Sequence, residues 1–346
     1  MKVVITGASG NVGTGLVRAL AADSTHHEVI GVCRRPPDAV APYAAVRWVA
    51  CDLAGDSAPD VLEEAMRGAD AVVHLAWMFQ PVRDGERLQR TNFKGTTAVL
   101  RAARRAGVRQ VVHGSSIAAY APAPAPVDES AATTGIPGSS YGAGKSEVES
   151  EVARFAQENP DIAVALVRPA LVAQAGASAS FLALFLDPVV PRQLFGLLRR
   201  GKLPLLPLPS SLRVQLVDAD DVGDAIVRIL KTRARGPFNI AADTLDVTDL
   251  ASTAGARAVP VRPGIARALV SLLWRLRVLR MSPGWFDVGT RSPLVDTARA
   301  RTELGWVPRK SSAACAREQL AGLAEATALP SPALRRDRFK TESPVS

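Results

Sequence analysis

Tyr141 and Lys145 stand four residues apart in the segment Tyr141-Gly142-Ala143-Gly144-Lys145. On a helix this spacing places the two side chains on one face, at neighbouring turns. A tyrosine ordinarily ionises near pH ~10, so a tyrosine that transfers protons at neutral pH needs a cation close to its phenol. The spacing therefore predicts that Tyr141 acts as an acid or base and that Lys145 lowers the pKa of its phenol.

A pair of serines follows an apolar segment that we expect to be a buried strand. Ser115 and Ser116 come directly after Val111-Val112-His113-Gly114. Ligands of open α/β sheets bind at the carboxyl ends of the strands, so these serines are placed where a substrate would lie. Ser116, Tyr141 and Lys145 together predict acid–base chemistry on a carbonyl or alcohol oxygen.

Glycine occurs at every third position of the segment Gly7-Ala8-Ser9-Gly10-Asn11-Val12-Gly13. This segment follows the first expected strand and leads into an expected helix. Glycine lets the backbone turn sharply and approach a pyrophosphate, whose charge is met by the N–H groups at the helix start. The strand, loop and helix together predict a dinucleotide-binding site. A tight turn without a ligand is the alternative.

Apolar segments alternate with amphipathic ones through the first half of the chain. The expected strands are 2–6, 29–33, 46–50, 71–75, 111–113 and 163–167, and the expected helices lie near 11–22, 86–106 and 143–157. Strands that are apolar on both faces indicate a parallel sheet covered by helices on each side. The fold class that we predict is α/β: a Rossmann doubly wound parallel sheet with a smaller C-terminal substrate-binding cap.

The predicted domain boundaries follow from where this alternation ends. The Rossmann domain covers residues 1–170 and is completed by parts of 213–241, where short strands and a helix return. The cap comprises 171–212 and 242–328, with helices expected near 265–280 and 312–326. Residues 329–346 are polar, charged and proline-containing, which predicts a disordered tail.

The end of the second strand reads Gly31-Val32-Cys33-Arg34-Arg35. An acidic residue here would bind the adenosine ribose of NAD, but none is present, and two guanidinium groups stand where a 2′-phosphate could be bound bidentately. We therefore expect NADP(H) as the cofactor, with NAD(H) as the alternative. Arg34 and Arg35 would in that second case be solvated loop residues.

The glycine spacing and the Tyr-x-x-x-Lys segment resemble the extended branch of the short-chain dehydrogenase/reductase superfamily, the NAD-dependent epimerase/dehydratase family. Further segments carry the resemblance: Asp52-Leu53, His74-Leu75-Ala76, Asn92-Phe93-Lys94-Gly95-Thr96, Arg168-Pro169 and Leu304-Gly305-Trp306-Val307-Pro308. The resemblance extends over most of the chain. It implies an enzyme that holds NAD(P) and that forms a homodimer through the helices near 86–106 and 143–157.

Residue roles follow from the same resemblance. Ser116, four residues before Tyr120, would bind the substrate oxygen, Tyr141 would pass the proton, Lys145 would bind the nicotinamide ribose and Asn92 would join a proton relay. The cofactor-binding residues, including the two arginines above, would be Gly7, Ser9, Gly10, Asn11, Val12, Gly13, Arg34, Arg35, Asp52, Leu53, Leu75, Ala76, Ser115, Tyr141, Lys145 and Pro169.

Apolar side chains dominate the first part of the cap: Phe181, Leu182, Leu184, Phe185, Leu186, Phe195, Leu197, Leu198 and residues 203–208. A sugar would leave hydroxyls unpaired on such a wall, each at a cost of ~1–3 kcal/mol, whereas an apolar carbonyl compound would not. This favours an NADP(H)-dependent oxidoreductase for a fairly apolar small molecule. The alternatives are that these residues are cap core or a dimer surface, that the protein is a nucleotide-sugar epimerase or dehydratase, or that it is a non-catalytic dinucleotide sensor.

Two groups of arginines in the second half of the chain leave further alternatives. Arg213 and Arg291 are candidate anion contacts or ordinary surface arginines. Leu269 to Leu279, with Trp274, Arg275, Arg277 and Arg280, forms a basic amphipathic segment. We interpret it as a packing helix in preference to a membrane-surface helix, because a cap helix must bury one apolar face.

Composition limits the other partners. The formal net charge of +9 is spread along the chain, so no nucleic-acid partner is expected. Cys33, Cys51 and Cys315 have no Cys-x-x-Cys spacing, so neither a disulfide framework nor a metal site is predicted. We expect no signal peptide, because Met1-Lys2 leads straight into the expected strand Val3-Val4-Ile5, and no membrane partner, because no charge-free apolar run of ~18 residues is present. The expected location is cytoplasmic.

Overall fold

A seven-stranded parallel sheet forms the centre of the computed structural model, which describes residues 1–79 and 83–337. Its strands stand in the order β10-β6-β5-β4-β1-β2-β3. They are β1 (Lys2–Thr6), β2 (Glu28–Cys33), β3 (Arg47–Ala50), β4 (Ala71–His74), β5 (Gln110–Gly114), β6 (Ala163–Pro169) and β10 (Gly236–Ile240). This arrangement confirms the predicted Rossmann α/β fold class.

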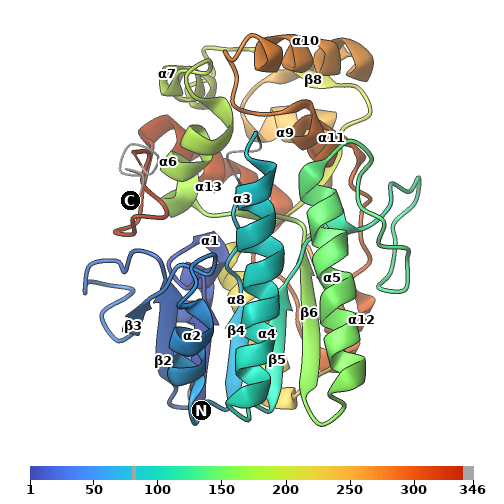
Figure 1. Cartoon of the computed structure of the whole chain (residues 1–346). Helices are drawn as coiled ribbons and strands as arrows, with labels where there is room; N and C mark the ends of the chain where they lie inside the picture. Colours follow the sequence, from blue (N-terminus) through green and yellow to red (C-terminus); the bar gives the residue numbers. More distant parts are fainter. Residues whose placement is uncertain (80–82, 338–346) are drawn as a thin grey trace.

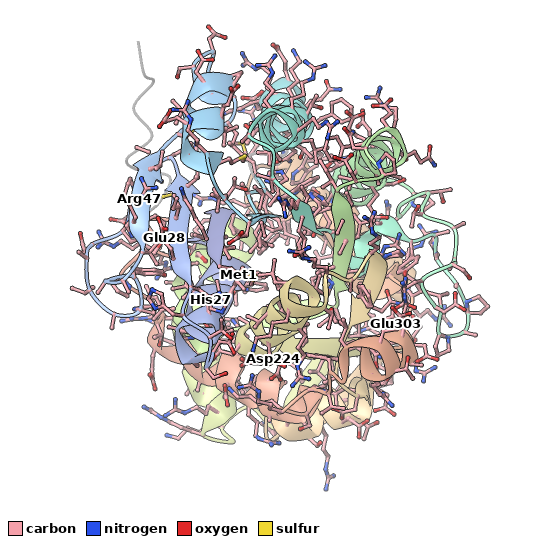
Figure 2. All side chains as sticks on the ribbon, turned by 90° about the horizontal axis from the view of Figure 1, so that it is seen from below. Met1, His27, Glu28, Arg47, Asp224 and Glu303 are labelled. Carbon is pink, nitrogen blue, oxygen red and sulfur yellow. The ribbon has the colours of Figure 1, made fainter. Side chains whose placement is uncertain are left out.

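Helices cover both faces of the sheet, as Figure 1 and the view from the amino ends of the strands in Figure 2 show. One face carries α1 (Asn11–Ala22), α8 (Ala219–Thr232) and α12 (Ala298–Leu304). The other carries α2 (Ala58–Met66), α4 (Gly95–Arg105) and α5 (Ser140–Glu158), with α3 (Gly85–Gln89) and a π-helical turn, η1 (Arg90–Lys94), ahead of α4. Both faces of the sheet are therefore buried.

The side chains of β1 show why the sheet strands are apolar throughout. Val3 and Ile5 pack into the core beneath α1 and α8, whereas Val4 packs into the core on the opposite face. All three are fully buried. Because successive strand residues point to opposite faces, a strand covered on both sides must be apolar at every position.

Close contact between α1 and α8 depends on two glycines. A Cβ atom at Gly15 would lie 2.1 Å from the carbonyl oxygen of Ala219, and one at Gly223 would lie 2.6 Å from the carbonyl oxygen of Gly15. Neither position has room for a larger side chain. The backbone of α8 thus touches the helix that begins at the glycine loop.

A cap lies over the carboxyl ends of the strands (Figure 1). It contains a three-stranded sheet in the order β11-β9-β7 and a two-stranded sheet, β12-β8. The strands are β7 (Leu171–Ala173), β8 (Leu205–Pro209), β9 (Arg213–Asp218), β11 (Thr244–Asp246) and β12 (Arg257–Val261). The helices are α6 (Ser178–Phe181), a π-helical turn η4 (Leu182–Leu186), α7 (Arg192–Arg199), α9 (Val247–Thr253), α10 (Pro263–Arg275), α11 (Pro283–Arg291) and α13 (Ser312–Glu325).

Three segments differ from the sequence-based expectation. Trp306, which we assigned to the cap, is fully buried in the Rossmann core and donates from Nε1 to the Asp221 carbonyl oxygen at 2.9 Å. Residues 329–337, which we expected to be disordered, are packed, with Ser331 and Leu334 buried; residues 338–346 lie outside the described part. Helix α10, which we expected to pack by its apolar face, has no buried residue.

No helix within residues 1–79 and 83–337 is long and apolar enough to cross a membrane.

Candidate active site

Ser116, Tyr141 and Lys145 come together at the carboxyl end of β5. Ser116 precedes the short 3-10 turn η2 (Ile117–Ala119), and its hydroxyl accepts from the Ala118 N–H at 3.1 Å. Tyr141 lies in the first turn of α5, which Ser139 caps by accepting from the Gly142 N–H at 3.2 Å. The hydroxyls of Ser116 and Tyr141 share a hydrogen bond. The fold therefore brings the predicted serine and tyrosine into direct contact.

The electrostatic setting of Tyr141 differs from the one that its spacing to Lys145 predicts. Burial raises the pKa of Tyr141 to about 12, with the hydrogen bond from Ser116 as the opposing influence. The Lys145 ammonium lies 6.0 Å from the centroid of the Tyr141 ring and is not among the groups that lower this pKa. In this structure Tyr141 is thus a neutral phenol at physiological pH, with a proton to donate.

Lys145 is held by neighbours other than Tyr141. Its side chain is buried, and Nζ donates to the Gly114 carbonyl oxygen at 2.8 Å and lies 3.6 Å from the centroid of the Trp77 ring. Burial lowers the pKa of Lys145 to about 7, and the Glu149 carboxylate opposes this shift. The carbonyl at the end of β5 and the indole face thus fix the position of the ammonium.

Aromatic rings enclose the Tyr141 phenol. Trp285 stacks on it with 4.4 Å between ring centroids, Phe79 stacks at 5.6 Å, and Trp77 lies edge-on at 6.0 Å. Phe185 continues this cluster by packing edge-on against Trp285 at 5.0 Å. The surroundings of the phenol are therefore mostly hydrocarbon.

Sequence reasoning singled out Phe181 and Phe185, which pack at 5.0 Å, but missed the other rings. Trp77 and Phe79 follow β4 directly, and aromatic residues at the carboxyl end of a central strand were a signal that could have found them. Trp285 lies in the first turn of α11, 144 residues after Tyr141. No local sequence pattern predicts the contact between Trp285 and Tyr141.

Asn92 lies on the π-helical turn η1 and is buried. Its side chain accepts from the Met78 N–H at 2.7 Å and donates to the Met78 carbonyl oxygen at 2.9 Å. Both halves of the amide are therefore used on the segment between Trp77 and Phe79. This placement fixes two of the rings around Tyr141.

Close backbone packing requires glycine at two positions of the glycine loop. Gly7 has a φ of +76°, and a Cβ atom there would lie 2.6 Å from the Ala76 nitrogen; one at Gly13 would lie 2.2 Å from the Gly7 carbonyl oxygen. Helix α1 begins at Asn11 with no side-chain cap and no acidic residue in its first turn. Its first N–H groups and its positive dipole end suit the phosphates of a dinucleotide.

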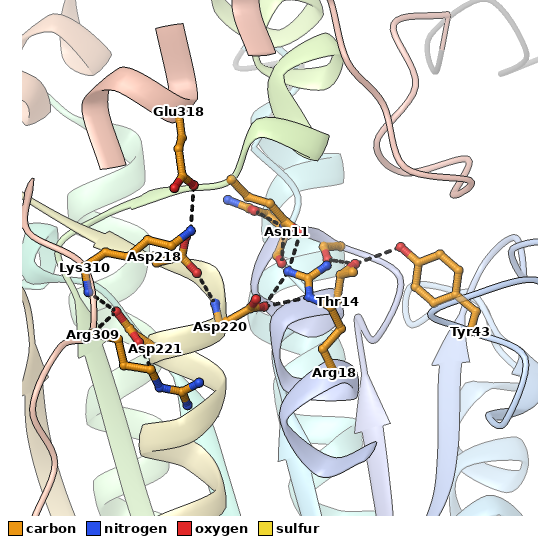
Figure 3. Close-up of polar contacts among 12 residues, drawn as sticks. Asn11, Thr14, Arg18, Tyr43, Asp218, Asp220, Asp221, Arg309, Lys310 and Glu318 are labelled. Atoms are coloured by element: carbon orange, nitrogen blue, oxygen red, sulfur yellow. Dashed lines mark hydrogen bonds and ion pairs between the residues drawn. The ribbon is translucent and has the colours of Figure 1, made fainter. Parts of the chain in front are cut away.

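Side chains at the start of α1, directly after the glycine loop, form hydrogen bonds to the cap, to Tyr43 and to α8 (Figure 3). Asn11 donates to the Val172 carbonyl oxygen at 3.1 Å and accepts from Gln174 Nε2 at 2.6 Å, so its side chain faces the cap. Thr14 Oγ1 shares a hydrogen bond of 2.8 Å with the buried Tyr43 hydroxyl, and Arg18 pairs with Asp220 of α8. These contacts fix the start of α1.

The C-terminal segment reaches the same loop. Ser331 is fully buried and donates from Oγ to the Ser9 carbonyl oxygen at 2.7 Å. Arg336 forms an ion pair with Asp187 of the cap. Residues 329–337 thus add a contact to the glycine loop that the sequence did not predict.

The other residues expected to hold a cofactor lie along the carboxyl edge of the sheet. Arg34 and Arg35 follow β2, and Asp52 follows β3 as an exposed residue that accepts from the Ala54 N–H at 3.1 Å. Leu75 and Ala76 follow β4 against Gly7, and the buried Leu53 packs near Gly95. Ser115 and Pro169 are buried at the ends of β5 and β6, and the Ser115 hydroxyl has no hydrogen-bond partner among the described residues.

A buried ion pair supports α5 from below. Arg168 of β6 donates from Nε and Nη2 to the two Glu149 oxygens at 2.8 and 2.6 Å, and from Nη1 to the Tyr120 hydroxyl at 2.7 Å. The Tyr120 hydroxyl donates in turn to Asn239 of β10 at 2.7 Å. This network fixes α5, which carries Tyr141 and Lys145, on the sheet.

Arg213 and Arg291 line one pocket with Ser211 and Thr290. Arg291 is the last residue of α11, the helix that carries Trp285 near its start. The pocket therefore lies at the other end of α11 from the aromatic cluster.

Metal-binding clusters are not found in the described part of the chain. Residues 1–79 and 83–337 contain no group of three or more His, Cys, Asp or Glu side chains that could hold an ion.

Comparison with known proteins gives a family match. A model described as the NAD dependent epimerase/dehydratase family matches residues 3–241. An uncharacterized protein of Mycobacterium tuberculosis is 38% identical over 116 residues, which are 34% of this chain and 12% of that protein. The sterol demethylase protein B of Methylococcus capsulatus is 34% identical over 178 residues, 50% of this chain and 52% of that one. The chain thus spans about half or less of the length of these relatives.

Further matches are partial in length or distant in sequence. The ceramide reductase of Caulobacter vibrioides is 38% identical over 123 residues, which are 35% of this chain and 36% of that protein. Among solved structures, gox2253 has a TM-score of 0.71 at 20% identity, covering 93% of this chain and 98% of its own. UDP-glucose-4-epimerase from Stenotrophomonas maltophila, with bound NAD and formylated UDP-arabinopyranose, has a TM-score of 0.69 at 21% identity, covering 94% and 98%.

Proposed function

The chain belongs to the NAD dependent epimerase/dehydratase family, a family of enzymes of the short-chain dehydrogenase/reductase type, and we propose that it is an NADP(H)-dependent oxidoreductase. In this proposal it interconverts a carbonyl and an alcohol on a fairly apolar small molecule. Ser116, Tyr141 and Lys145 carry the chemistry.

The observation that carries the proposal is the enclosure of Tyr141 by Trp77, Phe79 and Trp285. A sugar ring placed beside Tyr141 would meet aromatic carbon on several sides and would leave hydroxyls without partners. An apolar carbonyl compound has one oxygen to satisfy and gains from contact with the rings. The wall around the phenol therefore favours the apolar substrate.

The proton chemistry follows from the state of the two polar groups. Because burial raises the pKa of Tyr141 to about 12, its phenol is protonated at neutral pH and can donate to a developing alkoxide. Ser116, already hydrogen-bonded to the phenol, donates to the same substrate oxygen and orients it. Lys145, fixed by Gly114 and Trp77, has a pKa of about 7 and supplies a positive charge near Tyr141 when it is protonated.

A dinucleotide suits the glycine loop, because close backbone packing at Gly7 and Gly13 leads the loop into the start of α1, which has no side-chain cap and no acidic residue in its first turn. Gly7, Ser9, Gly10, Val12 and Gly13 would hold the pyrophosphate through backbone N–H groups. Arg34 and Arg35 would bind the 2′-phosphate of NADP(H), since the end of β2, Gly31 to Arg35, carries no carboxylate to repel it. When bound, the nicotinamide supplies or accepts the hydride.

Two partly matching relatives agree with an apolar substrate. They are named as a sterol demethylase protein and a ceramide reductase, and both names refer to lipids. These matches cover half of this chain or less. They support an apolar class of substrate and do not identify a particular substrate.

A second candidate is a nucleotide-sugar epimerase or dehydratase with a retained dinucleotide. The pocket that contains Arg213 and Arg291 favours it, because two guanidinium groups beside Ser211 and Thr290 suit a diphosphate. A solved structure of similar fold also contains a UDP-linked sugar.

The test measures cofactor consumption. The purified chain is incubated with NADPH and, separately, a medium-chain aldehyde, an aryl ketone, a steroidal ketone or UDP-glucose. Stoichiometric loss of NADPH absorbance with an apolar carbonyl compound is the expected result. Conversion of UDP-glucose without net loss of NADPH would favour the second candidate. Dinucleotide binding without turnover of any of these compounds would favour a sensor.

A further inference from the structure

Helix α10 presents its apolar side to solvent. Ile265, Leu269, Leu272 and Leu276 are 62%, 56%, 53% and 63% exposed, and their spacing of four, three and four residues places them on one stripe. We call these four residues the α10 stripe. A cap helix that packed in the usual way would bury such a stripe.

The opposite side of α10 is the one that contacts the protein. Arg267 binds the buried carboxylate of Asp287 on α11 at 2.8 Å from both Nε and Nη2. The Arg83 guanidinium lies 4.0 Å from the centroid of the Trp274 ring and donates to the Trp274 carbonyl oxygen at 2.6 Å. Polar contacts thus fix the helix with its apolar stripe outward.

Two cap segments around this helix carry positively charged side chains and no negatively charged ones. Residues 188–217 and 250–286 together contain eleven arginines and lysines and no aspartate or glutamate. The formal net charge of the whole chain is +9, so the rest of the chain is slightly acidic. The net positive charge of the chain therefore lies in these two segments, because they contain basic residues without acidic ones.

Arginines flank the α10 stripe directly. Arg262 precedes the helix, Arg275 ends it and Arg277 follows it, and all three are exposed. The two-stranded sheet of β8 and β12, which lies at the same end of the molecule in Figure 1, adds the exposed Leu205 and Val259. Apolar and basic side chains are thus combined at the end of the cap that lies away from the sheet.

We propose that the α10 stripe and its flanking arginines dock on an anionic lipid bilayer surface, with the helix lying in the headgroup region. Apolar side chains at this depth contact acyl chains while arginines pair with anionic headgroups. A nucleic acid would satisfy the arginines but not the stripe. A second copy of this chain would bring like charges face to face.

Helix α10 is connected to the candidate active site, so docking would also position that site relative to the bilayer. Helix α10 is tied through Arg267 and Asp287 to α11, which places Trp285 against Tyr141. A docked helix would hold the aromatic cluster close to the bilayer, where an apolar substrate partitions. The docking itself does not depend on the oxidoreductase activity, and its test uses no turnover.

The experiment is vesicle co-sedimentation of the full chain. Vesicles of phosphatidylcholine with about 30 mol% phosphatidylglycerol are compared with pure phosphatidylcholine at low and high salt. We expect the anionic vesicles to pellet at least about fivefold more protein, with binding that weakens as salt rises. Equal recovery in the supernatant with both vesicles would overturn the proposal.

Two double variants locate the surface. Leu269→Ser with Leu272→Ser removes the middle of the stripe, and Val40→Ser with Val307→Ser changes side chains that are 49% and 60% exposed and do not belong to α10. We expect the first to reduce vesicle binding at least about tenfold and the second to leave it unchanged, with melting temperatures and NADPH binding as checks of folding. Full vesicle binding by the stripe variant would contradict the proposal.

The remaining outcomes separate other occupants of the surface. Loss of a wild-type dimer in the stripe variant, without vesicle binding by the wild type, would identify the stripe as a self-interface. Binding to duplex DNA that survives the stripe variant would assign the arginines to nucleic acid. Either result would replace the lipid proposal.

Discussion

The indole of Trp285 stacks on the phenol of Tyr141, with 4.4 Å between the ring centroids and 29° between the ring planes. This contact joins α11 of the cap to α5 of the Rossmann domain. It also excludes water from one side of the phenol and contributes to the burial that raises the pKa of Tyr141.

Replacing Trp285 tests this contact. We expect Trp285→Ala to raise KM for an apolar carbonyl substrate by about tenfold, because the stacking surface for substrate and phenol is lost. Exposure of the phenol should also lower its pKa, so that activity in the reductive direction is lost at a lower pH than in the wild type. The matched control is Trp274→Ala, whose ring contacts Arg83 instead of Tyr141. A pH profile and KM equal to the wild type would argue against a role for Trp285.

The proton-donating role of Tyr141 predicts a separation of chemistry from binding. We expect Tyr141→Phe to lower kcat by about 10²–10⁴-fold while NADPH affinity stays within about twofold, because the hydroxyl hydrogen-bonds Ser116 and no group of the glycine loop. Steady-state kinetics and fluorescence titration measure the two effects. The double variant with Ser116→Ala should lose little more than Tyr141→Phe alone, since the hydroxyls act as a unit. Activity that survives Tyr141→Phe would show that another group transfers the proton.

Cofactor preference tests the arginines after β2. We expect Arg34→Ala and Arg35→Ala each to weaken NADPH binding by about tenfold or more and to leave NADH binding almost unchanged, because only NADPH carries the 2′-phosphate. Arg47→Ala serves as control, since Arg47 begins β3 at the opposite end of the sheet (Figure 2). Tighter binding of NADH than NADPH by the wild type would contradict the assignment.

The buried ammonium of Lys145 predicts a stability that depends on pH. Its pKa is about 7 in the folded chain and ~10.4 in an unfolded chain, so between these values the unfolded chain binds more protons and stability rises with pH. At pH 7 we expect Lys145→Met to raise the free energy of unfolding by about 1–3 kcal/mol, after allowing for the lost Gly114 bond. The gain should shrink towards pH 10, where the lysine is neutral in the folded chain.

Urea unfolding at pH 7 and pH 10 measures this difference, with Lys94→Met as the control on the neighbouring π-helical turn. Activity should be lost in Lys145→Met at either pH. A variant less stable than the wild type at pH 7 would mean that the contacts of the ammonium with Gly114 and Trp77 outweigh its desolvation.

The packed C-terminal segment predicts that its removal loosens the dinucleotide loop. We expect a chain that ends at Ala328 to lose about 2–4 kcal/mol of unfolding free energy, since Leu334 and the bond from Ser331 to Ser9 are removed. NADPH binding should weaken as well. A chain that ends at Asp337 keeps every described contact and is the control. Equal stability of the two truncated chains would show that residues 329–337 do not brace the loop.

Local patterns were sufficient for the strands and for the two motifs. Lys2–Thr6 was predicted with the observed bounds, and the other strands of the first half differ by a few residues at their ends. The period of the side chains and the glycine spacing are properties of a few consecutive residues, so sequence determines them. The same holds for Tyr141 and Lys145, whose spacing places them on α5 wherever that helix packs.

What the local patterns could not supply is the direction in which elements face and what touches them across long separations. The sequence shows the amphipathic pattern of α10 but does not indicate which side faces out, because that depends on the pairing of Arg267 with Asp287. The pKa of Tyr141 moved opposite to the expected direction, because burial among Trp77, Phe79 and Trp285 outweighs the hydrogen bond from Ser116, the one influence that lowers it. The tertiary structure decided both, since desolvation and burial are sums over neighbours that only the packed chain brings together.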